Sequence, residues 1–469
     1  MIDFSQLLRP DRGEQAHAVV LVDPAGRDEW LAAQPNQVRD AADMHRFTAK
    51  DGTHLLVPGP GSDPWRVIAA VGDARSPWAL AKLAQALPPG TYRIVGDVQP
   101  PALGWLLAQY RFERYRKAED AEPRVLLTAD AAGIDEALRV AEAIARVRDL
   151  VNTAAADLGP EELEAEAEAL ARRYGASTAV TRGDALATDY PMIHAVGQAA
   201  TRERAPRLIE LEWGDPAHPR VAIVGKGVCF DTGGLDIKPS AAMRLMKKDM
   251  GGAAHALALA GLVMGAKLPI RLHLLIPAVE NAVSAASFRP GDVLRSRRGL
   301  TVENTNTDAE GRLILGDALT KAAEGSPELI LDFATLTGAA RVALGPDLPA
   351  TFANDEALAA ELLAAGDAVE DPLWRLPLWN GYDEMLKSDV ADLVNAPEGG
   401  MAGAITAALF LRRFVPDGVA WAHLDTFAWR QSAKPGRPKG GDALGLRAAW
   451  TMLKRRYGAE GQALPPPPA

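Results

Sequence analysis

Two carboxylates stand two residues apart in the stretch Asn306–Leu313, at Asp308 and Glu310. If this stretch is extended, both side chains lie on the same side of the chain and can converge on one point. Two negative charges at such a distance repel each other unless a cation lies between them. The stretch therefore predicts one half of a metal site, with Arg312 adding a fixed positive charge beside it. The alternative is an ordinary helix start, because acidic residues favour the first turn of a helix.

A second group of acidic residues lies upstream, after the apolar run Val221–Val224. Asp231 and Asp249 stand among glycines, which allow the backbone to approach a ligand closely. Ligands of parallel sheets gather at the carboxyl ends of strands, so the segment after this run is well placed to bind one. A phosphate-binding loop does not fit, because the glycine and lysine spacing of that motif is missing. The sequence predicts that these residues supply the other half of the metal site.

Short apolar runs alternate with helical patterns along the chain, which is typical of α/β proteins with a mainly parallel sheet. Strands are expected at residues 17–23, 54–57, 66–71, 92–95, 124–127, 208–211, 221–224, 270–276, 329–333 and 419–424. Helices are expected at residues 77–87, 102–116, 134–152, 252–264, 312–323, 356–365, 402–414 and 444–457. A further helix is expected to begin at Pro160 and to end before Gly175. Because 469 residues exceed one usual core, we expect two domains, residues 1–155 and residues 156–469.

The chain carries a formal net charge of −10, which argues against general binding to nucleic acid or to an anionic membrane. Its single cysteine, Cys229, excludes an intrachain disulfide and fits a reducing compartment. The sequence starts without a basic segment followed by an apolar core, and it has no apolar run of about 20 residues. We therefore expect a cytoplasmic protein that does not contact a membrane.

Several motifs in the second domain resemble those of the leucyl aminopeptidase family of two-metal exopeptidases. They are Val224–Gly227, Phe230–Gly234, Ile237–Pro239, Lys248–Ala254, Arg289–Leu294, Asn306–Leu313, Asp332–Gly338, Ser388–Leu393 and Gly403–Ala408. The resemblance extends from about Asp149 to Trp429, and the segment Gly440–Leu446 departs from the pattern of many members. It implies an N-terminal macro-like α/β domain, a C-terminal three-layer α/β/α catalytic domain with a mainly parallel sheet, and a homohexamer.

The resemblance also implies roles for individual residues. The metal ligands would be Lys226, Asp231, Asp249, Asp308 and Glu310. Lys238 would polarise the substrate carbonyl, and Arg312 would hold a bicarbonate ion that acts as general base. The positions near the substrate or the bicarbonate would be Met246, Asn306, Ala309, Gly311, Thr335, Leu336 and Gly338. From the sequence alone, Lys226 also fits an ordinary surface lysine and Met246 an ordinary core methionine.

The reaction implied is the release of N-terminal amino acids from peptides, leucine-like ones by preference, by attack of a water that bridges two metal ions. The ions would be Mn²⁺ or Zn²⁺, since oxygen-rich ligands suit Mn²⁺ and the family also uses Zn²⁺. Two other functions stay open at this point: a different two-metal hydrolase such as a phosphoesterase, and the DNA binding that some members of the family show. The lack of a histidine-rich ligand set and of a phosphate loop argues against the first, and the acidic charge balance argues against the second.

Overall fold

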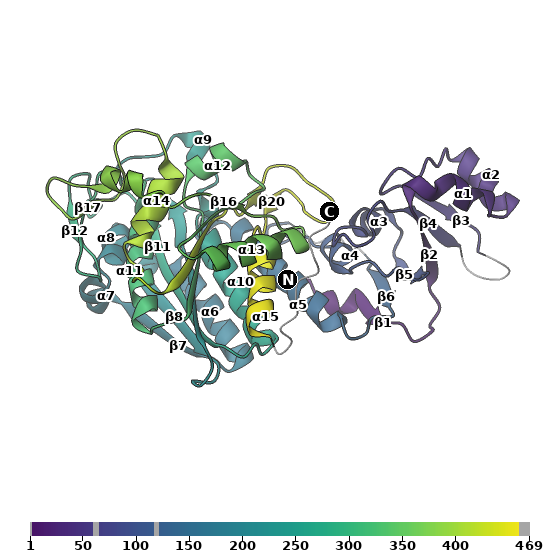
Figure 1. Ribbon diagram of the computed structural model, residues 1–469, viewed down its shortest axis with the longest axis horizontal. Coiled ribbons are helices and arrows are strands. Elements are labelled where there is room, and N and C mark those ends of the chain that lie inside the picture. The colour runs from purple at the N-terminus through teal and green to yellow at the C-terminus, as the bar shows by residue number, and fades with distance from the viewer. Residues whose placement is uncertain (1, 60–64, 117–121, 459–469) are drawn as a thin grey trace. The chain divides into compact units, whose positions relative to one another are not determined.

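The computed structural model describes residues 2–59, 65–116 and 122–458 of the chain (Figure 1). Within these residues the chain forms two compact units. Unit 1 consists of Met1–Ala145 and Ser432–Lys439, and unit 2 consists of Arg146–Gln431 and Gly440–Ala469. The junction falls within helix α5 (Ile134–Asn152). The domain boundary expected after residue 155 stays a prediction.

Unit 1 contains a six-stranded sheet with the spatial order β1-β6-β5-β2-β4-β3. The strands are β1 (Leu8–Pro10), β2 (His17–Val22), β3 (His54–Val57), β4 (Arg66–Ala70), β5 (Gly90–Val95) and β6 (Arg124–Thr128). All neighbouring strands are parallel except β3 and β4, which are antiparallel. The helices that follow and precede these strands are α1 (Arg27–Ala32), α2 (Asn36–Met44), α3 (Ala81–Ala86) and α4 (Leu103–Leu107). This alternation of strands and helices is the expected α/β organisation.

Two helices of unit 1 are shorter than the sequence predicts. The helices expected at residues 77–87 and 102–116 are reduced to α3 and α4. After α4, the side chain of Gln109 binds both backbone groups of Arg124 in β6: its Nε2 donates to the carbonyl at 3.0 Å, and its Oε1 accepts from the N–H at 2.9 Å. Because this side chain is tied to the sheet, the chain turns towards β6 instead of continuing the helix.

Unit 2 is organised around a nine-stranded sheet with the order β16-β15-β18-β14-β9-β11-β8-β7, and β10 pairs separately with β11. The strands are β7 (Ser177–Arg182), β8 (Arg207–Trp213), β9 (Arg220–Gly225), β10 (Gly227–Asp231), β11 (Arg271–Asn281), β14 (Leu329–Ala334), β15 (Ala350–Ala353), β16 (Trp374–Arg375) and β18 (Ala420–Asp425). The central strands β11, β9, β14 and β18 are parallel, and the antiparallel pairs lie towards the two edges. This sheet confirms the expected fold class.

Helices cover both faces of the large sheet, as Figure 1 shows. On one face α10 (Gly251–Gly265) packs on β9 and β14, with α6 (Pro160–Tyr174) and α15 (Leu446–Tyr457) against it. On the other face α11 (Glu310–Glu324) packs on β9 and β11, with α8 (Pro191–Gly197) and α14 (Gly403–Arg412) against it. Unit 2 therefore has three layers. Its other elements are α7 (Gly183–Asp189), α9 (Ser240–Met243), α12 (Gly338–Leu344), α13 (Glu356–Ala368), β12 (Val293–Arg295), β13 (Thr301–Glu303), β17 (Leu393–Val394), β19 (Trp429–Arg430) and β20 (Gly440–Gly441).

The local sequence explains how two of these helices are placed. Helix α6 begins at Pro160, and Gly175 follows its last residue with a left-handed φ of 69°, as expected. Helix α10 is apolar on nearly all sides and almost entirely buried, because it lies between the sheet and an outer layer of helices. A Cβ at Gly252 would lie 2.1 Å from the carbonyl oxygen of Phe333 in β14. Only glycine allows the start of α10 to lie this close to the carboxyl end of that strand.

The carboxyl ends of several strands of unit 2 lie together where β9 and β14 finish. Strand β9 ends at Gly225, and the next residue, Lys226, donates its backbone N–H to Phe333 at 3.0 Å and accepts from the N–H of Ala253 at 2.8 Å. Strand β10 ends at Asp231, and β14 is followed directly by Thr335. Ligands of α/β sheets bind at this edge, so the fold brings the candidate residues to the expected place.

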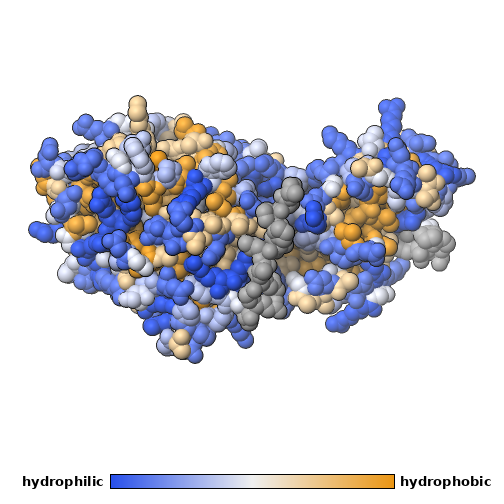
Figure 2. All heavy atoms as spheres, in the orientation of Figure 1, coloured by the Kyte–Doolittle hydropathy of each residue, from blue (hydrophilic) through white to orange (hydrophobic). Residues whose placement is uncertain are grey.

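In the part of the chain that the structure describes, no helix is long and apolar enough to cross a membrane. The face of the molecule in Figure 2 shows areas of hydrophobic residues bordered by hydrophilic ones.

Candidate active site

Three carboxylates converge at the edge of the large sheet. Asp231 ends β10, Asp308 lies in a turn, and Glu310 is the first residue of α11. One oxygen from each of them lies within 4.8 Å of the others. Asp231 and Glu310 are buried, whereas the side chain of Asp308 is 34% exposed. The two loops that the sequence singled out thus meet in space.

The backbone conformation predicted for Asp308 and Glu310 is wrong in one respect. The sequence predicted an extended segment in which both side chains point the same way, but residues 307–308 form a turn and α11 starts at Glu310. The helix is thus two residues longer at its start than expected. Convergence comes from the change of direction between the turn and the first helical residue, and Glu310 also benefits from the positive end of the helix dipole.

Lys226 lies between two of the acidic side chains. Its Nζ is 2.6 Å from Asp249 Oδ2 and 2.9 Å from Glu310 Oε1, and it donates to the carbonyl of Thr335 at 3.2 Å. Burial lowers the pKa of Lys226, but the carboxylates of Asp249, Glu310 and Asp231 outweigh burial and raise it overall. A Cβ at Gly311 would lie 2.5 Å from Lys226 Cε, so a larger residue at this position would displace the end of the lysine side chain.

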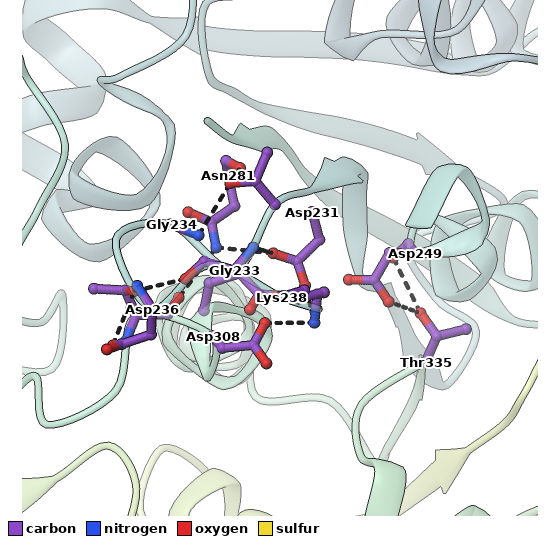
Figure 3. A network of polar contacts seen from close by, with 12 residues as sticks. Asp231, Gly233, Gly234, Asp236, Lys238, Asp249, Asn281, Asp308 and Thr335 are labelled. Carbon is purple, nitrogen blue, oxygen red and sulfur yellow. Dashed lines mark hydrogen bonds and ion pairs between the residues drawn. The ribbon is translucent and has the colours of Figure 1, made fainter. Parts of the chain in front are cut away.

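Lys238 lies between the other two carboxylates, those of Asp231 and Asp308 (Figure 3). Its Nζ lies 2.8 Å from Asp231 Oδ2 and also forms an ion pair with Asp308. Burial lowers the pKa of Lys238, but Asp231, Glu310 and Asp308 outweigh burial and raise it. The four carboxylates and two ammonium groups therefore form two adjacent sets, one around each lysine.

Not every carboxylate oxygen of the cluster has a donor. Glu310 Oε2 is buried and accepts no hydrogen bond from any described residue. Burial, followed by the charge of Asp231, raises the pKa of Glu310 to about 8 and that of Asp308 to about 6. A buried carboxylate oxygen without a donor fits a cation as its partner. The donor set of carboxylate oxygens and one amine nitrogen suits divalent ions such as Mn²⁺ or Zn²⁺.

Asp249 is held on its outer side by Thr335, whose hydroxyl donates to Asp249 Oδ1 at 2.8 Å (Figure 3). Burial raises the pKa of Asp249, but Lys226, Lys248 and Lys238 together outweigh burial and lower it to about 2. Met246 begins the 3-10 helix η5 (Met246–Lys248), which leads directly into Asp249. Thr335 thus contacts this carboxylate, and Met246 lies three residues before Asp249, with its carbonyl accepting the N–H of Asp249 at 3.2 Å.

Asn281 and Asp236 are site residues that the sequence analysis missed. Asn281 Nδ2 donates to Asp231 Oδ1 at 2.9 Å and to the carbonyl of Thr307 at 3.0 Å. Asp236 Oδ2 accepts the backbone N–H of Thr307 at 2.8 Å. In Figure 3 Asn281 lies above Asp231 and Asp308, and Asp236 lies at the left of the network. The only sequence signal for Asn281 is that it follows a long apolar run, at the carboxyl end of β11 beside β10.

Arg312 has one free donor in the buried interior. Its Nη1 donates to the carbonyl of Asn395 at 2.7 Å, whereas its Nε is buried and has no hydrogen-bond partner among the described residues. Burial lowers the pKa of Arg312 to about 10, against the charges of Glu310 and Asp425. A guanidinium with an unused N–H in this position fits a small anion such as bicarbonate.

The other positions expected near the substrate or the bicarbonate are placed as follows. The N–H of Leu336 donates to Asp425 Oδ1 at 2.9 Å, and the N–H of Ala309 donates to the carbonyl of Asn306 at 3.1 Å. These two N–H groups therefore already have partners within the protein. Gly338 is exposed at the start of α12.

Comparison with known proteins gives matches for both units. The model of the cytosol aminopeptidase family, catalytic domain, matches residues 145–449, and the model of the M17 aminopeptidase, N-terminal domain, matches residues 18–128. A probable cytosol aminopeptidase of Nitratidesulfovibrio vulgaris is 43% identical over 480 residues, which cover 91% of this chain and 94% of that protein. One of Syntrophotalea carbinolica is 42% identical over 393 residues, covering 80% of this chain and 78% of that protein.

Solved structures are similar over nearly the whole chain. The crystal structure of cytosol aminopeptidase from Coxiella burnetii has a TM-score of 0.92 and 44% sequence identity, and the match covers 96% of this chain and 99% of that one. The bottromycin maturation enzyme BotP in complex with Mn has a TM-score of 0.84 and 32% identity, covering 94% of this chain and 100% of that one. Together with the match to the catalytic-domain model, these findings show that this chain belongs to the cytosol aminopeptidase family of metal-dependent exopeptidases.

Proposed function

We propose that this chain releases N-terminal amino acids from unblocked peptides, with leucine-like residues preferred, at a site that binds two divalent ions. The observation that carries this proposal is the convergence of Asp231, Asp308 and Glu310, whose oxygens lie within 4.8 Å of one another. Glu310 Oε2 in particular is buried without a donor from the described residues. Such an arrangement of like charges is stable when cations lie between them.

The ligands of the two ions are Lys226, Asp231, Asp249, Asp308 and Glu310 in this proposal. When bound, divalent ions of this kind polarise a carbonyl and lower the pKa of water. Lys226 can act as a ligand only as the neutral amine, because an ammonium has no lone pair. Its carboxylate neighbours favour the ammonium, so metal uptake has to release a proton and is expected to strengthen as the pH rises. Measuring the activity after exchange of Mn²⁺ for Zn²⁺ tests which of the two ions the protein uses.

Lys238 and Arg312 provide the fixed charges of the proposed reaction. Lys238 is positively charged between Asp231 and Asp308, so its ammonium can polarise the substrate carbonyl and stabilise the negative charge that develops on that oxygen. The free Nε of Arg312 is available to hold bicarbonate, which would accept a proton from the attacking water. The N–H of Gly311, in the first turn of α11, lacks a partner inside the helix and suits the same anion.

Met246 supports the preference for leucine-like residues, because a methionine side chain adapts to branched aliphatic groups. We also propose that the protein acts in the cytoplasm as a homohexamer, as the family resemblance implies. The mass in solution, measured by light scattering during size-exclusion chromatography, tests the assembly.

The activity is tested with the purified chain after dialysis against Mn²⁺ or Zn²⁺. Leucine p-nitroanilide should be hydrolysed, and its N-acetylated form should not, because a blocked amine cannot bind as a free N-terminus does. Metal content should approach two ions per chain by elemental analysis. Equal hydrolysis of the blocked and free substrates would contradict an aminopeptidase.

A further inference from the structure

Two cationic side chains contact the same aromatic ring beside the candidate active site. Lys248 Nζ lies 5.3 Å from the centre of the Phe427 ring, and Arg341 Cζ lies 4.8 Å from it. Lys248 ends η5, Arg341 belongs to α12, and Phe427 lies two residues beyond the end of β18. Three segments that are distant in the sequence thus place two positive charges around one ring.

This group of Lys248, Arg341 and Phe427 adjoins the residues proposed to contact the first side chain of the substrate. Lys248 shares its single helical turn with Met246 and precedes Asp249. Arg341 Nη2 lies 3.6 Å from the point where a Cβ on Gly338 would stand. Lys248 thus lies two residues from Met246 in the chain, and Arg341 lies beside Gly338.

The protein itself compensates these two charges poorly. Lys248 is 1% exposed, and its nearest carboxylate oxygen, Asp249 Oδ1, is 3.7 Å away. That oxygen already accepts the hydroxyl of Thr335, and Asp249 belongs to the proposed metal ligands. Among the described residues, no carboxylate pairs with Arg341, whose Nη1 donates only to the carbonyl of Thr337 at 3.2 Å. Lys248 is a buried positive charge without a full partner, which favours an anion supplied from outside. Arg341 is partly exposed and adds a second positive charge beside the same ring.

We propose that the pocket for the first residue of the substrate also accepts acidic side chains, with the carboxylate of an N-terminal glutamate or aspartate directed towards Lys248 and Arg341. The methylene groups of such a side chain would lie against Met246 and Phe427. This assignment deepens the proposed function and rests on it. Leucine-like and acidic residues share the pocket because its wall carries both an apolar methionine and two cations.

The test compares glutamyl, glutaminyl and leucyl 7-amido-4-methylcoumarin as substrates of the metal-loaded protein. These amides have no terminal carboxylate, so the side chain is the only carboxylate of the glutamyl substrate. The glutaminyl substrate has a side chain of the same shape without the charge and is the control. The wild-type ratio of kcat/KM for the glutamyl over the glutaminyl substrate should exceed one. Lys248→Met and Arg341→Met should each reduce this ratio by about 10-fold to 100-fold, as expected for a hydrogen bond to a charged group.

Lys247→Met is the matched control. This neighbouring lysine donates its Nζ to the carbonyl of Asn152 at 2.6 Å and does not contact Phe427 in the structure, so its loss should leave the ratio unchanged. Arg341 is partly exposed on α12, so Arg341→Met remains a usable variant if Lys248→Met does not fold.

The outcomes separate this inference from the proposed function. An unchanged ratio in both Lys248→Met and Arg341→Met would show that the cations serve only to hold Phe427, and would overturn the inference. Wild-type protein that hydrolyses the leucyl substrate but discriminates against the glutamyl one also overturns it, while the aminopeptidase activity stands. Failure to hydrolyse any of the three substrates contradicts both.

Discussion

Two of the buried clusters of opposite charges in unit 2 differ in how their carboxylate oxygens are used. In the first, Asp442 Oδ1 accepts from Arg148 at 3.1 and 3.0 Å, and Oδ2 accepts from Arg430 at 2.8 Å. In the second, the candidate active site, Glu310 has one oxygen near Lys226 and the other, Oε2, buried with no donor among the described residues. Asp442 and Glu310 are both almost inaccessible to solvent.

The direction of the pKa shifts follows this difference. Burial raises the pKa of Asp442, but Arg148 and Arg430 outweigh burial, and the pKa is lowered overall. Burial also raises the pKa of Glu310, and here the charge of Asp231 adds to it, so the pKa rises to about 8. A cluster that serves the fold satisfies its charges internally, whereas a cluster that binds ions keeps some of them unsatisfied. The two clusters can be separated by experiment.

The largest effect is expected for Glu310→Gln. The amide keeps the shape of the side chain but loses the charge that the proposed ions need, and losing several kcal/mol of transition-state stabilisation reduces the rate by about a thousand-fold or more. Metal content should fall with the rate, as measured by elemental analysis, and circular dichroism should show a folded protein. Glu324→Gln, at the other end of α11, is the control and should keep its metal. Full metal content in Glu310→Gln would remove Glu310 from the ligand set.

The next largest effect is expected for Asp442→Asn, on stability and not on metal binding. Removing one partner of a buried ion pair costs about 3–5 kcal/mol, and Asp442 is the carboxylate that Arg148 and Arg430 share. Because folding lowers the pKa of Asp442, its stabilising effect is present above the unfolded-state value of about 4 and is lost as the pH falls through the folded-state value. Urea unfolding at pH 7 and near pH 3 measures this, and an equal cost at both pH values would argue against the ion pair.

The smallest effect is expected for Asn281→Leu, which removes the two hydrogen bonds that orient Asp231 and join its loop to Thr307. Residues that orient a metal ligand typically contribute 10-fold to 100-fold to metal affinity. Calorimetric titration with Mn²⁺ should show a loss in that range. Asn354→Leu is the control, because this side chain also forms two hydrogen bonds to the backbone, at Val419 and Trp421. It lies between β15 and β18, several strands away from β11 and its partner β10, so its loss should leave the affinity unchanged. Equal affinities in the two variants would leave Asn281 a purely structural role.

Sequence patterns located β9 and β14, which are apolar runs bounded by glycine or polar residues, but they did not locate β10, the strand that ends at Asp231. They also indicated the acidic loop after β9, because its carboxylates stand among glycines at the carboxyl end of a strand, where ligands bind. They could not reveal Asn281, because a single asparagine after a long apolar strand has no distinctive pattern. Nor could they give the length of α4, which Gln109 limits through a bond to a strand 15 residues away.

The sequence by itself determined which chemistry is available: the acidic residues, the two lysines and the glycines that let the backbone pass. Local patterns are enough for this, because residue type and spacing decide charge and backbone freedom. Only the tertiary structure decided the pairing, in which Lys226 faces Asp249 and Glu310 while Lys238 faces Asp231 and Asp308. These contacts join segments up to 84 residues apart (226 to 310), and such distances are set by how parallel strands and helices pack, which no local pattern records.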